Sequence, residues 1–208
     1  MIQIFLKGGP IMWPLLCTSL VALTIVIERL WFVVSERRRR QPEVVEGILS
    51  AVEKGDVAGA IHRGNGTTDF VARTLVDALQ YRGTSLSNAL LRTANRELKR
   101  FNQGLAALDT IITLAPLLGL LGTVTGMIHA FGLIGNAELD SPTVITGGVA
   151  EALIATAYGL GIAITALIPF NYLNARMEEA RHEIQDAATH LELLAAKPDV
   201  MTRAAIGA

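Results

Sequence analysis

Three side chains in the later apolar stretches of the sequence are of types that could pass a proton or an ion. Glu151 and Thr156 lie within residues 145–173, where nearly every other residue is apolar or small, and Thr123 lies in the preceding apolar stretch, residues 105–134. A carboxylate inside a lipid-spanning helix costs about 3 kcal/mol unless it faces protein or water. Such a group is retained where ions or protons pass, or where a partner helix is held.

The two threonines are predicted to lie at the same depth in the bilayer. Thr123 precedes Ile134 by 11 residues, and Thr156 follows Ile145 by 11 residues. If these isoleucines mark the outer ends of their spans, both hydroxyls lie about 16 Å inward, near the bilayer centre. Several copies of the chain would then form a polar ring. Alternatively, each hydroxyl binds the carbonyl four residues before it and does nothing else.

Glu151 is expected about 9 Å inside the outer end of its span. Two interpretations of this carboxylate stay open. It contributes to an ion path or meets a partner helix, or it reaches the outer interface or pairs within the helix bundle.

Small residues recur at helical spacing in both spans. Because small side chains let helix backbones approach closely in lipid, these positions predict helix packing faces. The residues are Gly119, Gly122 and Gly126 in one span and Ala155 and Gly159 in the next.

Composition supports a membrane protein. The chain has 208 residues, of which 51% are hydrophobic and 18% charged, with a mean hydropathy of +0.42. This balance is too apolar for an ordinary soluble domain. A net charge of −1 gives no indication of nucleic-acid binding, and the single cysteine, Cys17, excludes an intrachain disulfide.

We predict an all-α membrane protein with three transmembrane helices, of which spans two and three extend into a cytoplasmic helical bundle. The predicted segments are a periplasmic lead (1–10), transmembrane helix 1 (11–34), a cytoplasmic helical region (35–104), transmembrane helix 2 (105–134), a periplasmic loop (135–144), transmembrane helix 3 (145–173) and a cytoplasmic helix and tail (174–208).

Within the polar region, glycines punctuate helices expected at about 42–54, 56–63 and 67–81. From Thr84 and Ser85, a good N-cap pair, helical composition runs unbroken to about Phe131. If its amphipathic first half and its apolar second half form one helix, that helix is about 70 Å long, well beyond the membrane. After Leu173, apolar residues recur at alternating spacings of four and three as far as Leu194, which is the seam of a coiled coil or helical bundle.

Charge predicts the orientation. Arginines 37–40, the cluster at 96–100, and Arg176 with Arg181 flank the three apolar runs on one side, whereas residues 135–143 carry no Lys or Arg. The positive-inside rule places these basic segments in the cytoplasm and the N-terminus in the periplasm of an inner membrane.

Enzyme signatures are not found in the sequence. The glycines of the second span match neither a dinucleotide fingerprint nor a P-loop, and His182-Glu183 does not continue to a second histidine at residue 186. The histidines have no metal-ligand spacing, so neither a metal nor a cofactor is expected.

Two long motifs resemble a known family. Residues 115–127, APLLGLLGTVTGM, are similar to the second-span signature of the MotA/TolQ/ExbB proton-channel family, and residues 148–160, GVAEALIATAYGL, are similar to its third-span signature. Residues 8–30 resemble the first span of ExbB-like members. Three spans favour the ExbB/TolQ branch over the four-span MotA branch.

The resemblance implies a function and partners. Members form pentamers around a dimer of a single-span ExbD/TolR-like protein, whose membrane aspartate is protonated and released in turn. The resulting motor energises envelope or outer-membrane processes, with a TonB- or TolA-like protein as a transducer. By motif position, Thr123 and Thr156 correspond to the pore-lining threonines and Glu151 to the third-span glutamate. The main alternative is a membrane scaffold that conducts nothing.

Overall fold

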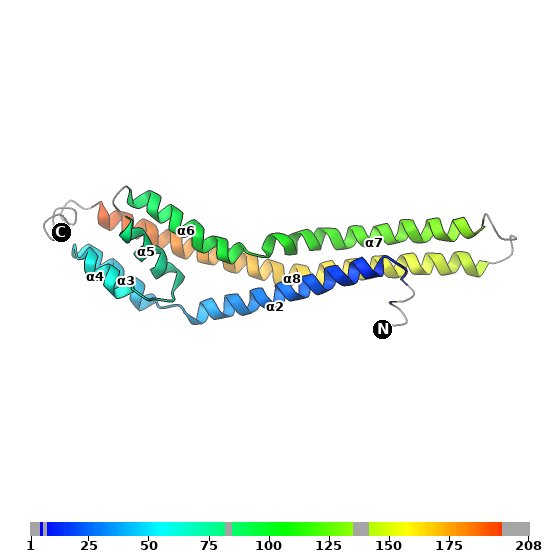
Figure 1. The fold of residues 1–208 in the computed structure, drawn as a ribbon, viewed down its shortest axis with the longest axis horizontal. Helices are drawn as coiled ribbons and strands as arrows, with labels where there is room; N and C mark the ends of the chain where they lie inside the picture. The colour runs from blue at the N-terminus through cyan, green and yellow to red at the C-terminus, as the bar shows by residue number, and fades with distance from the viewer. Residues whose placement is uncertain (1–4, 6–7, 82–84, 135–141, 197–208) are drawn as a thin grey trace. The chain divides into compact units, whose positions relative to one another are not determined.

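The fold is entirely helical over the residues that the structure describes. The computed structural model describes residue 5 and residues 8–81, 85–134 and 142–196. Its helices are α2 (Met12–Arg38), α3 (Pro42–Glu53), α4 (Val57–Gly64), α5 (Phe70–Gln80), α6 (Leu86–Asn102), α7 (Leu105–Ile134) and α8 (Pro142–Ala195) (Figure 1). The predicted all-α fold is confirmed. Most of the predicted loop 135–144 and the tail from residue 197 lie outside the described residues.

The chain divides into two compact units. Unit 1 comprises residues 1–29 and 104–173, and unit 2 comprises residues 30–103 and 174–208. Both α2 and α8 contribute residues to each unit. The unit boundaries fall within a few residues of the predicted change from membrane spans to polar regions.

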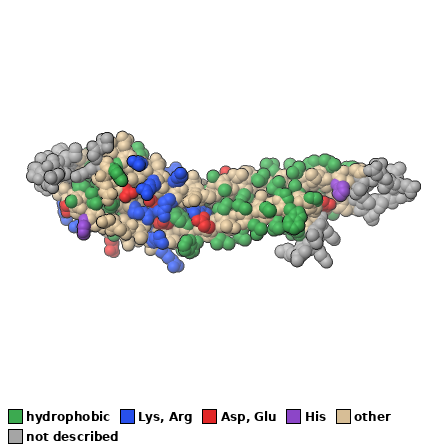
Figure 2. Space-filling view, in the orientation of Figure 1, with side chains coloured by type: hydrophobic (Ala, Val, Ile, Leu, Met, Phe, Trp, Pro, Cys, Tyr) green, Lys and Arg blue, Asp and Glu red, His purple; other side chains and the backbone are tan. Residues whose placement is uncertain are grey.

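Unit 1 contains the apolar helical segments. Within the described residues, three ranges hold helix long and apolar enough to cross a membrane: Met12–Arg38, Leu86–Gly132 and Thr146–Ala195. Large apolar side chains such as Leu117, Ile128 and Leu153 are exposed on α7 and α8, and Figure 2 shows hydrophobic atoms across this surface. A water-soluble monomer rarely exposes so much apolar surface, so lipid or neighbouring helices cover it.

The two halves of the helical stretch from about residue 84 to Phe131 do not form one helix. α6 ends at Asn102, Gln103 is extended with ψ 130°, and Gly104 has φ +81°. A side chain at residue 104 would be strained by this φ and would also meet Ile25 Cγ2 at 3.2 Å. Gly104 therefore separates α6 from α7. α8, in contrast, is continuous from Pro142 to Ala195 and passes through Pro169.

Unit 2 is a bundle of short helices in which α3, α4 and α5 contact one another and α5 contacts α6. The predicted seam of α8 is already buried by other residues of the same chain. Subunits could contact one another through this seam only if those residues moved away from it. The seam residues are Leu173, Met177, Ala180, Ile184, Ala187, Leu191 and Leu194.

Asp69 organises the entry to unit 2. Its side chain is fully buried, accepts hydrogen bonds from Val71 N (2.8 Å) and Ala72 N (3.2 Å) at the start of α5, and accepts another from Gln41 N (2.6 Å). It also forms an ion pair with Arg40. One carboxylate thus caps α5 and holds the connection between α2 and α3, because backbone donors and a guanidinium converge on it.

We expect Asp69→Ala to lower the free energy of unfolding of unit 2 by about 3 kcal/mol, because it removes a cap and leaves buried donors without a partner. Asp56→Ala is the matched control, since Asp56 is exposed and its side chain caps α4 by accepting a hydrogen bond from Gly59 N at 2.8 Å. Its loss should cost about 1 kcal/mol. Hydrogen exchange of the α5 amides measures the difference, and equal effects of the two substitutions would contradict it.

Candidate functional site

The predicted packing glycines lie where α7 meets α8. A Cβ at Gly126 would be 3.1 Å from Ala152 Cβ and 3.2 Å from Gly148 O, and a Cβ at Gly122 would be 2.5 Å from Ala155 Cβ. A Cβ at Gly159 would be 3.1 Å from Gly119 Cα and would also collide with the carbonyl oxygen of Ala115. The two spans of one chain therefore approach backbone to backbone, as small residues permit in lipid.

Thr156 joins the two helices by a hydrogen bond. Its hydroxyl donates to Gly119 O at 2.9 Å, across a sequence separation of 37 residues. The contact depends on Gly119, because a Cβ there would lie 3.0 Å from Thr156 Cα. The alternative in which Thr156 only binds its own helix is therefore not what the structure shows.

Thr123, in contrast, forms its hydrogen bond within its own helix. Its hydroxyl donates to Leu120 O of its own helix at 2.7 Å. The residue is partly exposed and lines an open groove of about 720 Å³ between α7 and α8. Thr123 supplies the hydroxyl of this otherwise apolar groove, whose other lining residues are Val124, Met127, Ile128, Phe131, Val149, Ala152 and Leu153.

The two hydroxyls are at one level of α7. They bind the carbonyls of Gly119 and Leu120, which are consecutive residues. Consecutive carbonyls differ by about 1.5 Å along a helix axis. The two hydroxyl groups therefore lie near one level along α7, and their depth in a bilayer stays a prediction.

Glu151 is partly buried and lies against the segment that precedes α2. A Cβ at Gly9 would be 2.8 Å from Glu151 Cδ and 3.2 Å from its Cγ. The carboxylate is five residues before Thr156, so it stands about 7.5 Å along α8 from the threonine level. Glu151 thus packs within its own chain, and its part in an ion path stays a prediction.

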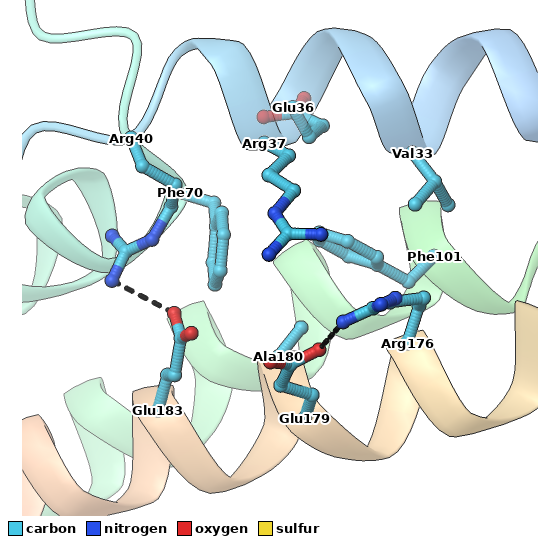
Figure 3. Close-up of a pocket in the computed structure, with 10 residues that line it drawn as sticks. All are labelled: Val33, Glu36, Arg37, Arg40, Phe70, Phe101, Arg176, Glu179, Ala180 and Glu183. Atoms are coloured by element: carbon cyan, nitrogen blue, oxygen red, sulfur yellow. Dashed lines mark hydrogen bonds and ion pairs between the residues drawn. The ribbon is translucent and has the colours of Figure 1, made fainter.

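Unit 2 holds a second group of charges, in a pocket of about 70 Å³ between α2, α5, α6 and α8 (Figure 3). Arg40 Nη2 lies 2.7 Å from Glu183 Oε2, and Arg176 pairs with Glu179 on α8. Arg40 also lies 4.8 Å from the ring centroid of Phe70. Burial raises the pKa of the Glu183 carboxyl, and the Arg40 charge opposes this rise.

Comparison with known proteins identifies the family. Residues 65–186 match the MotA/TolQ/ExbB proton channel family. The chain therefore belongs to this family, and its relatives place it in the ExbB/TolQ-like branch of multi-pass membrane proteins that drive transport.

Two relatives from Synechocystis sp. cover most of the chain. The putative biopolymer transport protein ExbB-like 1 is 37% identical over 91% of this chain and 77% of its own length. The putative biopolymer transport protein ExbB-like 3 is 34% identical over 91% of this chain and 92% of its own. The Tol-Pal system protein TolQ of Haemophilus influenzae is 40% identical over a shorter part, 40% of this chain and 36% of its own.

Several residues of these sites were not predicted from the sequence. Gly148 packs on α7, with a Cβ position 2.5 Å from Ala130 Cβ, and Gly9 contacts Glu151. Gly148 continues the spacing of Ala152 and Ala155 and could have been included in the small-residue face. The partner of Gly9 lies 142 residues away in the sequence, and no local pattern indicates such a contact.

We expect Gly159→Ala to destabilise unit 1 by roughly 1–3 kcal/mol, because the added methyl group meets backbone atoms of α7 that cannot rotate away. Gly161→Ala is the matched control two residues further along α8, where a Cβ meets nothing within 4 Å. That variant should be neutral or stabilised by up to about 1 kcal/mol through helix propensity. Thermal unfolding in detergent compares them, and a similar loss in both would argue against the close contact.

The raised pKa of Glu183 predicts a pH dependence of stability. The folded chain binds this proton more tightly than the unfolded chain, so the contribution of Glu183 to stability falls as pH rises from its ordinary pKa of 4.5 to the raised value. Glu183→Gln should remove this decline, and Glu178→Gln, on the same helix, should leave it. Melting temperatures between pH 4 and pH 8 measure it. An unchanged slope in Glu183→Gln would contradict the assignment.

Proposed function

We propose that this chain is the channel subunit of an inner-membrane motor driven by the proton-motive force. It assembles as a pentamer around a dimer of a single-span ExbD/TolR-like protein, and the motor energises an envelope or outer-membrane process, with a TonB- or TolA-like transducer where that process requires one. The observation that carries this proposal is the pair of hydroxyls at one level of α7, within spans of a proton-channel family.

The side chains at the hydroxyl level support a partner protein that supplies the group which binds and releases the proton. At the hydroxyl level, unit 1 offers threonine side chains and apolar groups, and Glu151 stands about 7.5 Å away along the helix. A hydroxyl is a small polar group that can hold water or meet a carboxyl there. A membrane aspartate of the partner at this level would complete the path through Thr123 and Thr156. One proton crossing 100 mV releases about 2.3 kcal/mol, which can bias a rotation step between states of similar free energy.

The proposed orientation follows from the basic residues. Arginines 37–40, the cluster at 96–100, Arg176 and Arg181 all belong to unit 2. Unit 2 is then cytoplasmic, and the N-terminal lead and the segment between α7 and α8 are periplasmic.

Proton flux into liposomes that hold the chain with its single-span partner tests the role of the hydroxyls. The double substitution Thr123→Val/Thr156→Val keeps the side-chain shape and removes both hydroxyls, and we expect the flux to fall by at least about tenfold, equivalent to about 1.4 kcal/mol. Losing the bond between Thr156 and Gly119 costs about 0.6 kcal/mol, so the complex should still assemble.

Thr125→Val is the matched control. Thr125 is on α7, two residues from Thr123, and donates within its own helix to Leu121 O at 3.0 Å, outside the groove. The proton flux of Thr125→Val should equal that of the wild type. Thr156→Ser keeps the hydroxyl group and should retain most of the flux. Wild-type flux in the double variant would assign the hydroxyls to packing and favour a scaffold that does not conduct.

A further inference from the structure

Gly9 occupies a position where a side chain is doubly excluded. Its φ of +74° is in the left-handed region, which favours glycine. The space a Cβ would fill is taken by the end of the Glu151 side chain, with Cδ 2.8 Å and Cγ 3.2 Å from that point. The backbone of the lead segment and a membrane carboxylate therefore touch without an intervening side chain.

The neighbouring residues of the lead also pack on α8. A Cβ at Gly8 would lie 3.1 Å from Ile154 Cγ2, and Phe5 and Ile11 pack against the buried cluster that includes Ala155. Glu151 and Ile154 are three residues apart and share a helix face. Gly8 and Gly9 therefore meet the same face of α8.

The described residues of the lead form backbone hydrogen bonds up to the start of α2. Gly8 N donates to Phe5 O at 3.1 Å, and Met12 N donates to Gly9 O at 3.2 Å. Met12 and Leu15 of the first turns of α2 are fully buried. Gly9 is thus bonded to the buried start of α2, and its backbone limits where the end of the Glu151 side chain can rest.

We propose that Gly9 is a positioning residue for Glu151: the absence of a side chain at residue 9 seats the carboxylate against the lead and covers it on that side. The functional importance of this seat rests on the proposed channel function and on the predicted place of Glu151 in its proton path. The contact itself is a property of the chain alone.

Gly9→Ala should move the carboxylate and leave the fold intact. The atoms in the way are the far end of a flexible side chain, which rotates more easily than the packed backbone shifts. An alanine at φ +74° also adds backbone strain. Gly66→Ala is the control for this strain, because Gly66 has φ +78° and a Cβ there meets nothing within 4 Å.

Reaction of Glu151 with dicyclohexylcarbodiimide in membranes holding the full chain and its partner measures the cover on the carboxyl group. Mass spectrometry of the peptide that contains residue 151 gives the rate. We expect Gly9→Ala to raise this rate at least threefold and Gly66→Ala to leave it within a factor of 1.5. A rate in Gly9→Ala that is less than threefold higher than in the wild type, or that Gly66→Ala matches, would overturn the proposal.

The Glu151→Asp background separates positioning from a general defect. Aspartate is one methylene shorter and withdraws from Gly9, so adding Gly9→Ala should change its labelling rate by less than 1.5-fold. An equal increase in both backgrounds would show that residue 9 acts through the backbone alone and would contradict the proposal. Labelling requires no proton flux, so failure of the channel assignment would leave this result unaffected, and the pH profile of flux in Gly9→Ala tests the functional link separately.

Discussion

The backbone-to-backbone contact between α7 and α8 is the constraint on which the arrangement of the membrane unit depends. Two glycines, Gly119 and Gly159, remove the side chains that would separate the helices, and the Thr156 hydroxyl then reaches Gly119 O. Because lipid tails offer no hydrophobic force to press helices together, this packing and the hydrogen bond fix their register. That register in turn sets the level of Thr123 and the groove that Thr123 lines.

The polar groups of the membrane unit are divided between two places. The hydroxyls lie at one level of α7, and Glu151 is seated against Gly9 nearer the start of α8. In the proposed motor, the hydroxyl groups meet the partner's carboxyl group. The seat at Gly9 positions Glu151, a carboxylate of the chain itself. Unit 2 uses its charges differently: the Asp69 carboxylate caps α5, and its ion pair with Arg40 helps to hold the connection between α2 and α3.

The sequence predicted features that depend on spacing along one helix. The bounds 105–134 of the second span agree with α7, and the alternating apolar spacing after Leu173 marked residues that are buried. The helix break was not predicted, because Gly104 lies within helical composition, and it is the extended Gln103 and the φ of +81° at Gly104 that end the helix in the structure. Contacts between distant residues were also out of reach: nothing local pairs Thr156 with Gly119, or Glu151 with Gly9. Such pairings depend on the rotation of one helix against another, which a single sequence does not determine.

The central claim is that the chain meets the protonatable group of its partner at the hydroxyl level of α7, and disulfide cross-linking tests it most directly. With Cys17 replaced by serine, Thr123→Cys would be combined with a cysteine in place of the partner's membrane aspartate, and Ile164→Cys, on the exposed surface of α8, would serve as the control. The account predicts an oxidised heterodimer of chain and partner from Thr123→Cys and none from Ile164→Cys. Cross-linking from Ile164→Cys alone, or from neither position in an assembled complex, would contradict it.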